Sequence, residues 1–241
     1  MANRISATRS DRRTTSPPHL PRLRFSVRRA TIVAPPPPTD ADSWKPRPMP
    51  RTLPVPAAAA LVLIAVLALQ ATALHAMGQP TICTCGILRP WQGDVLGPEN
   101  SQQLTDWYTF SHVLHGMIFY AGLRIFAPRL PLLAALGLAL GIECAWELLE
   151  NSPVVIDRYR AQALAQGYSG DSIVNSLSDT CAATLGFVLA RTLPTRWSIG
   201  FAVAAELFTG AMIHDNLTLN VIQLVHPVDA IAAWQTGRDD R

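Results

Sequence analysis

The sequence has few charged residues for its length. Charged side chains make up 15% of the 241 residues, whereas soluble domains typically hold about 25%. Apolar residues make up 49%, and the mean hydropathy is +0.19. These values exclude an ordinary soluble globular domain and favour a membrane protein.

The sequence also lacks the common local motifs of catalysis. It contains no Walker phosphate-binding loop, no HExxH motif and no recognisable nucleophile motif. Cysteine is scarce: Cys83 and Cys85 form one Cys-X-Cys pair, and Cys144 and Cys181 lie singly in apolar runs, where we expect them to pack. The pair is compatible with a strained disulfide, with thiolate metal ligands or with free thiols. Without a second pair nearby, a structural zinc site has weak support.

Positive charge is concentrated at the N-terminus. Residues 1–51 hold eleven Lys and Arg against three Asp and Glu, leaving nine against fourteen in the rest of the chain. This segment is rich in Pro, Ser and Thr and lacks apolar periodicity, so we expect a disordered basic arm, 1–51, before a transmembrane domain, 52–241. The arm could touch anionic lipid or nucleic acid, be a solvated tail, or precede a true start at Met49. We expect no specific nucleic-acid partner.

Five predominantly apolar runs are long enough for membrane-spanning helices. The first could also be a cleaved signal peptide, because Ala71-Thr72-Ala73 resembles a cleavage site, although the run is longer than a usual signal core. A surface helix is expected over 153–166, and the apolar stretch 217–234, broken by Pro227, is expected to be interfacial or re-entrant. The sequence therefore predicts an all-α fold, a polytopic membrane helical bundle. Its five expected transmembrane helices cover about 57–77, 108–126, 132–150, 171–190 and 197–213.

Arginine placement predicts the orientation of this bundle. Short loops rich in Lys and Arg stay in the cytoplasm. One expected turn carries Arg124 and Arg129 and another carries Arg191 and Arg196, so both turns and the N-terminus should be cytoplasmic. The loop with Cys83 should then lie outside. We expect a multi-pass protein of the bacterial inner membrane, with the lipid bilayer as its partner and an unknown oligomeric state.

Polar side chains recur at one depth of the expected spans, in the half nearest the cysteine loop. Glu143, Glu147 and Glu150 follow i, i+4, i+7 spacing, which places three carboxylates on one face of an otherwise apolar helix. Charges inside a membrane are costly unless they are paired or wetted, so these groups should face one another. We expect a catalytic pocket of His112, His115, Glu143, Glu147, Asp171 and Asp179, with His112, His115 and Glu147 as candidate ligands of a divalent metal. A polar rim is expected from Cys83, Cys85, Asp106, Glu150, Arg158, Asn175, Glu206, His214 and Asp215.

Several of these residues have a purely structural alternative. Asp106 and Asp171 could be helix N-caps. His112 or His115 alone is more often a packed, hydrogen-bonded histidine than a ligand. Two carboxylates four residues apart within a span are harder to explain without a site, so the glutamates of the third run carry the argument for a functional pocket.

Five stretches between about Met77 and Trp234 carry a resemblance: ICTCG, ENSQQLTDWYTFSHVLHGMIFY, ECAWELLENSPVVIDRYR, GDSIVNSLSD and DNLTLN. They are similar to a family of small bacterial inner-membrane proteins of uncharacterised function. The resemblance implies a polytopic membrane protein and no established activity. A fainter likeness, in the order and spacing of His, Glu and Asp or Asn on successive spans, is to the Z-type glycopeptide-resistance membrane proteins. Phe110 stands where the first family would have proline, which affects the bend entering the second span.

Three functions fit this pattern. The first is an enzyme or envelope-modifying protein whose pocket, open to the outer face, performs acid/base or metal-assisted chemistry on a lipid-linked or cell-wall substrate. The second is a transporter or permeability factor that uses the same groups as a proton or ion relay. The third is a non-catalytic scaffold in which they form a buried structural network. The residues alone do not choose among the three.

Overall fold

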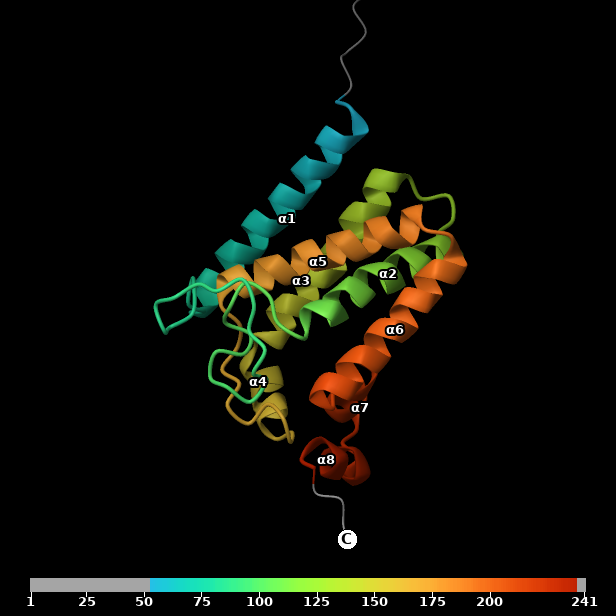
Figure 1. The fold of residues 1–241 in the computed structure, drawn as a ribbon. Coiled ribbons are helices and arrows are strands. Elements are labelled where there is room, and N and C mark those ends of the chain that lie inside the picture. Colours follow the sequence, from blue (N-terminus) through green and yellow to red (C-terminus); the bar gives the residue numbers. More distant parts are fainter. Residues whose placement is uncertain (1–52, 238–241) are drawn as a thin grey trace, which may run out of the picture. The chain divides into compact units, whose positions relative to one another are not determined.

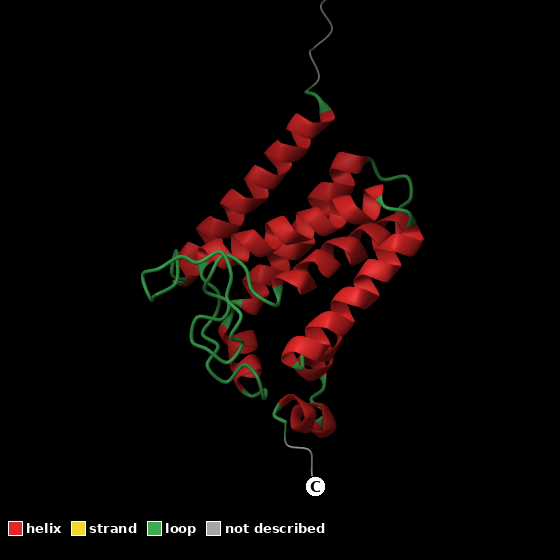
Figure 2. Cartoon of the chain, viewed as in Figure 1, coloured by secondary structure: helices red, strands yellow, loops and turns green. Residues whose placement is uncertain are grey.

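The structure is a computed structural model, and it describes residues 53–237 of the chain. Within this part the chain forms eight α-helices and no β-strand, with one isolated bridge between Gln92 and Asp106 (Figures 1 and 2). The expected all-α helical membrane bundle is therefore confirmed. The expected basic arm, 1–51, lies outside the described residues.

Helix boundaries follow the prolines and glycines that interrupt the apolar runs. Pro54, Pro131 and Pro194 each precede a helix, at positions where a missing N–H costs no intrahelical hydrogen bond. The first helix ends at Gly78, whose φ of +91° is the left-handed conformation typical of a helix C-terminus. The elements are α1 (Val55–Met77), α2 (Thr109–Phe126), α3 (Leu132–Glu150), α4 (Pro153–Arg160), α5 (Ile173–Thr192), α6 (Thr195–Ile213), α7 (Leu217–Val225) and α8 (Asp229–Gln235).

Three helices are long and apolar enough to cross a membrane, namely α1, α3 and α5. The pair α6 and α7, bent by 72°, makes a fourth if the two helices form one broken span. Five spans were expected, and α2 accounts for the main difference. Its 18 residues include His112, His115 and Arg124. Because α2 packs against α3, α5 and α6, its buried polar side chains face other helices.

The bundle has two unlike ends, which we call the loop end and the turn end. The loop end carries the segments 78–108 and 161–172 together with α4, α7 and α8 (Figure 1). In the described part of the chain, the turn end carries the start of α1 and the short connections 127–131 and 193–194. The arginines that flank these two connections therefore lie at the same end of the bundle, as the orientation argument requires.

The most extensive helix contact joins α2 to α5. Gly116 of α2 lies against the carbonyl of Ala183, and Gly186 of α5 lies against the carbonyl of Val113. A Cβ atom at either glycine would overlap the facing backbone. Small residues of this kind let two helices approach closely. The close approach brings the polar first halves of α2 and α5 side by side.

Apolar packing fills the half of the bundle near the turn end. Its centre is formed by Leu136, Ala139, Leu140 and Phe187, with side chains of α1 and α2 packed around them. The buried carboxyl groups and the buried imidazole lie in the opposite half, near the loop end. Polar and apolar layers are thus separated along the helix axes.

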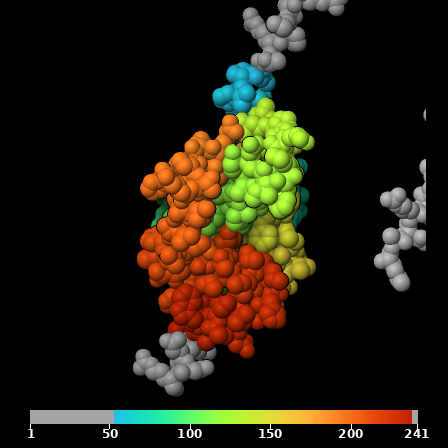
Figure 3. Space-filling view, turned by 90° about the vertical axis from the view of Figure 1, so that its right-hand side faces the viewer, coloured from blue at the N-terminus to red at the C-terminus, as the bar shows by residue number. Residues whose placement is uncertain are grey.

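The outer surfaces of α1 and α6 are strongly apolar. Leu69 is 63% exposed on α1, and Trp197 and Leu207 are 62% and 69% exposed on α6. Figure 3 shows the face on which α6, in orange, adjoins the red α7 and α8. Contiguous exposed apolar side chains on long helices are typical of surfaces that face lipid.

Candidate functional site

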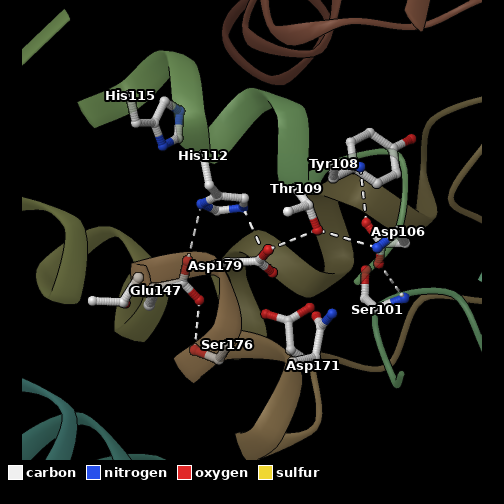
Figure 4. Close-up of polar contacts among 12 residues, drawn as sticks. Ser101, Asp106, Tyr108, Thr109, His112, His115, Glu147, Asp171, Ser176 and Asp179 are labelled. Atoms are coloured by element: carbon white, nitrogen blue, oxygen red, sulfur yellow. Dashed lines mark hydrogen bonds and ion pairs between the residues drawn. The ribbon is translucent and has the colours of Figure 1, made fainter. Parts of the chain in front are cut away.

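His112 lies at the centre of the buried polar cluster. Its Nδ1 atom is 2.6 Å from Oε1 of Glu143 and 3.2 Å from Oε1 of Glu147, and its Nε2 atom is 3.9 Å from Oδ2 of Asp179. Figure 4 shows the imidazole between Glu147 and Asp179. Glu143 and Glu147 reach the same ring because they are one helical turn apart on α3. Both glutamates are 0% exposed.

Glu143 connects two imidazoles. Its Oε1 atom contacts His112, and its Oε2 atom lies 3.1 Å from Nδ1 of His115. His115 is one turn further along α2, where its ring stacks on Phe119 and meets Trp146 edge to face. Ligand atoms of His112, His115 and Glu143 lie within 4.8 Å of one another, as do those of His112, Glu147 and Glu150. The structure thus groups both histidines with Glu143, whereas the sequence had suggested Glu147 as their partner.

Glu147 is held from the side away from His112. Its Oε2 atom accepts a hydrogen bond of 2.5 Å from the hydroxyl of Ser176 on α5. Its Oε1 atom is buried and accepts no hydrogen bond from the described residues, although His112 Nδ1 is near. A buried carboxylate oxygen without a donor is costly, so this atom is a candidate acceptor for a proton or a cation.

Gln70 supports this arrangement from α1. Its amide nitrogen donates to the hydroxyl of Ser176 at 2.7 Å, and its amide oxygen accepts from Thr180 at 2.7 Å. The side chain is 0% exposed. Sequence reasoning missed this residue, although it is the first polar side chain in the apolar run that begins at Val55, and that position was an available signal.

Asp179 links the cluster to the loop end. Its Oδ1 atom accepts from the hydroxyl of Thr109 at 3.1 Å, and the same hydroxyl accepts the backbone N–H of Asp106 at 3.1 Å (Figure 4). Asp106 in turn accepts the backbone N–H groups of Ser101 and Tyr108. Asp106 therefore stabilises the turn that leads into α2. This role is similar to the helix N-cap that was the structural alternative for this residue. Burial raises the pKa of Asp106 above its ordinary value in spite of these hydrogen bonds.

Asp171 does not cap α5. The N-cap is Ser172, whose hydroxyl accepts the backbone N–H of Asn175 at 3.2 Å. Asp171 instead forms a reciprocal pair with Asn151: it accepts from the amide nitrogen at 2.6 Å, and its own N–H donates to the amide oxygen at 2.7 Å. The hydroxyl of Tyr168 donates to its second oxygen at 2.9 Å. Burial raises the pKa of Asp171 to about 6.

Most of the expected rim residues hold the covering segments in place and lie apart from His112. Glu206 accepts the backbone N–H groups of Leu217 and Thr218 at 3.0 Å each, and so anchors the start of α7. Arg158 donates to the carbonyl of Leu224 at 2.8 Å. The others are Asn175, which donates to the carbonyl of Gln103; Asp215, which accepts from Tyr108 and Gln235; and the exposed His214, whose ring lies against Trp234.

The cysteine pair is also remote from the imidazoles. Cys83 and Cys85 are joined in a disulfide within the segment 78–108, with Cys83 buried and Cys85 exposed. Of the single cysteines, Cys144 is buried, as expected of a packing residue, whereas Cys181 is exposed. A disulfide leaves no thiolate at this pair for a metal ion.

A cavity opens beside the cluster at the loop end. It encloses about 650 Å³ of space between atoms, its open mouth included. His112, His115 and Asp179 line it, and no lysine or arginine lines it among the residues that the structure describes. Its other named walls include Tyr108, Trp146, Glu150, Tyr159, Tyr168 and Asp171. The cavity is therefore rich in carboxyl groups and aromatic rings, with the imidazoles as its basic groups.

Comparison with known proteins gives a family and relatives. The profile of the family described as "Protein of unknown function (DUF2585)" matches residues 74–237. A protein of Sphingopyxis alaskensis named "UPF0314 protein" is 52% identical over 173 residues, which cover 71% of this chain and 91% of that protein. A UPF0314 protein of Brucella anthropi is 47% identical over 171 residues, covering 71% and 87% of the two chains. No solved structure matches.

Proposed function

Since this chain belongs to the DUF2585 family of proteins of unknown function, its activity has to be argued from its own residues, and we propose a membrane enzyme. In this proposal a multi-pass protein of the bacterial inner membrane performs acid/base or metal-assisted chemistry on a lipid-linked or envelope substrate. The observation that carries the proposal is His112, held among the buried carboxyl groups of Glu143, Glu147 and Asp179 beside an open cavity.

The charge balance of the cluster favours chemistry over packing. Three buried carboxyl groups surround one buried imidazole, and no lysine or arginine lines the adjoining cavity among the described residues. Buried carboxylates are stable only with bound protons or cations near them. An imidazole can donate and accept protons, and a divalent cation on the same ligands would activate water.

The donor set suits a transition metal better than calcium or magnesium. Two imidazoles and one carboxylate, from His112, His115 and Glu143, already have ligand atoms within 4.8 Å of one another. Nitrogen with carboxylate ligation is typical of zinc, manganese and iron sites. Glu147, whose Oε1 atom accepts no hydrogen bond from the described residues, would then be placed to take a proton from a bound water.

A transport function is less well supported, because within residues 53–237 the polar cluster does not continue through the bundle. Beyond Thr180 and Thr184 on α5, the half near the turn end is filled by Leu140, Phe187 and their apolar neighbours. A proton or ion relay needs groups along its whole path. A cavity that ends within the bundle suits an enzyme or a binding site better.

Orientation follows from the two ends of the bundle. Arg129 lies in one connection of the turn end and Arg196 lies next to the other, and the rule for basic loops assigns such connections to the cytoplasm. The loop end, with the cavity and the disulfide of Cys83 and Cys85, would then face the outside, where disulfides persist. A substrate embedded in the outer leaflet could reach the cavity from there.

Metal analysis tests the metal-assisted form of this proposal. Full-length protein purified in detergent is incubated with Zn²⁺, Mn²⁺ or Fe²⁺, desalted and analysed for bound metal. We expect about one ion per chain, lost in His115→Ala and Glu143→Gln and retained in His214→Ala, because His214 is exposed and lies against Trp234. Equal retention in all four proteins would contradict this ligand set.

A second measurement tests the enzymatic proposal as a whole. Lipid extracts from cells that produce wild-type protein are compared by mass spectrometry with extracts from cells that produce His112→Ala at the same level. We expect at least one lipid-linked or envelope component to differ in abundance. Identical extracts would contradict a catalytic role for His112.

A further inference from the structure

We propose that the mouth of this cavity binds a protonated primary amine, as found in the headgroup of an aminophospholipid or in a free alkylamine. The observations are its aromatic walls, its carboxyl groups and the absence of lysine and arginine from the described lining. The inference rests on the proposed function in that it names the charged group of the substrate.

Aromatic rings form two adjoining walls of the cavity. The rings of Tyr159 and Tyr168 meet with centroids 5.3 Å apart and planes at 86° to each other, which makes a corner. Their hydroxyl groups donate elsewhere, from Tyr159 to Asn220 at 3.1 Å and from Tyr168 to Asp171 at 2.9 Å. These hydrogen bonds fix the rings, whose faces attract an ammonium group by cation–π interaction.

The charges of the cavity fit a cation and oppose an anion. Glu150, Asp171 and Asp179 all line it. A phosphate or carboxylate entering alone would meet these carboxyl groups without a compensating cation. An ammonium group would instead offset the negative charge that accumulates around His112.

One lining residue also favours an amine that carries N–H groups. The side-chain oxygen of Asn100 is buried and accepts no hydrogen bond within the described part of the chain. A primary ammonium offers three donors, whereas a quaternary ammonium offers none. We therefore expect ethanolamine to bind more tightly than choline.

A cation outside the mouth suits the phosphate of a zwitterionic headgroup. The Nε atom of Arg160, on α4, donates to the backbone carbonyl of Tyr168 at 2.6 Å, and the side chain is exposed. A phosphate beside Arg160 would sit outside the aromatic corner while the ammonium group entered it. This arrangement favours the aminophospholipid over the free amine.

Binding measurements on full-length protein in detergent test the inference. The probes are ethanolamine, choline, and short-chain phosphatidylethanolamine and phosphatidylglycerol. We expect saturable binding of phosphatidylethanolamine at least tenfold tighter than of phosphatidylglycerol, and of ethanolamine tighter than of choline. If ethanolamine binds as tightly as phosphatidylethanolamine, the phosphate adds nothing to binding. That result would assign the site to free amines and would remove the role of Arg160. Equal affinity for both lipids would overturn the inference.

Variants identify the site and separate this inference from the proposed chemistry. Glu150→Gln and Tyr159→Leu should each weaken phosphatidylethanolamine binding tenfold or more. Two control variants should not weaken it to this extent. Tyr159→Phe keeps the aromatic ring, and Asp94→Asn changes an exposed carboxyl group in the segment 78–108. Unchanged binding in both Glu150→Gln and Tyr159→Leu would overturn the site. The binding measurement requires no turnover by the His112 cluster, so a failure of the catalytic proposal leaves it interpretable.

Discussion

Asp171 illustrates what burial does to a single carboxyl group in this protein. It is 5% exposed, and its carboxyl group accepts hydrogen bonds from two neutral donors, the side-chain amide of Asn151 and the hydroxyl of Tyr168. Desolvation therefore outweighs the hydrogen bonds and raises its pKa from 3.8 to about 6. The folded protein holds this proton more tightly than the unfolded chain does.

This pKa predicts how stability depends on pH. A raised carboxyl pKa contributes stability that is complete below about pH 4 and is lost as pH rises through about 6, at most about 3 kcal/mol of the free energy of unfolding. Asp171→Asn keeps a neutral group of the same shape. Its midpoint of thermal unfolding in detergent, relative to wild type, should therefore rise between pH 4.5 and pH 7.5.

The matched control is Asp94→Asn, because Asp94 is exposed at the same end of the bundle. Its unfolding midpoint should stay parallel to that of wild type over this range. If Asp171→Asn also runs parallel to wild type, the buried carboxyl is ionised in the folded protein throughout and the argument from desolvation fails.

Gln70 makes a second prediction at this scale. Gln70→Leu removes the amide that pairs with Ser176 and Thr180, so the buried Thr180 hydroxyl loses its acceptor and the Ser176 hydroxyl loses a donor. We expect a loss of about 1–3 kcal/mol in the free energy of unfolding, measured by thermal unfolding in detergent. Thr72→Val, on the exposed side of the same helix, should cost much less. Equal effects would mean that Gln70 does not anchor α1.

The residues of the site were only partly predictable from the sequence. The spacing of Glu143 and Glu147 placed both on one helix face, and the structure has both beside His112. Which glutamate lies nearest depends on the rotation of α3 about its axis, and no periodicity fixes that rotation. The partner of Gln70 lies 106 residues away, so its contact depends on tertiary packing alone.

At the scale of helices, the α2–α5 contact gives a third prediction. Gly116→Ala should place a methyl group into the carbonyl of Ala183 and cost about 3 kcal/mol or more. Gly122→Ala, on the same helix with open space around it, should be neutral or stabilising by up to about 1 kcal/mol. The measurement is the yield of monodisperse protein after size-exclusion chromatography. Comparable yields from both variants would show that these helices can move apart at little cost.

The helices themselves were more predictable than their contacts. The apolar run expected over 132–150 has the bounds of α3, and those expected over 57–77 and 108–126 differ from α1 and α2 by two residues or fewer. Proline, glycine and arginine mark these bounds in the sequence, because they interrupt apolar runs locally. The surface helix expected over 153–166 is shorter, since α4 ends at Arg160 and the chain then turns. Nothing local to the sequence marks that end.

At the scale of the whole molecule, the orientation can be tested directly. Reporter fusions at Arg129, in the connection 127–131, and at Gly167, in the segment 161–172, should report the cytoplasm and the exterior respectively. The arginines near both connections of the turn end supply the physical reason. The reverse pattern would place the cavity on the cytoplasmic side and exclude a substrate in the outer leaflet.

The position of α2 in the chain has a consequence for biogenesis. This helix carries the imidazoles of His112 and His115, yet the carboxyl groups that face them belong to α3 and α5, which the ribosome makes later. When α2 emerges, α1 is the one long apolar helix among the described elements made before it. Stable integration of α2 into lipid must therefore wait for the helices that follow. Until then α2 is the segment by which quality-control proteases and chaperones can recognise an incompletely assembled chain.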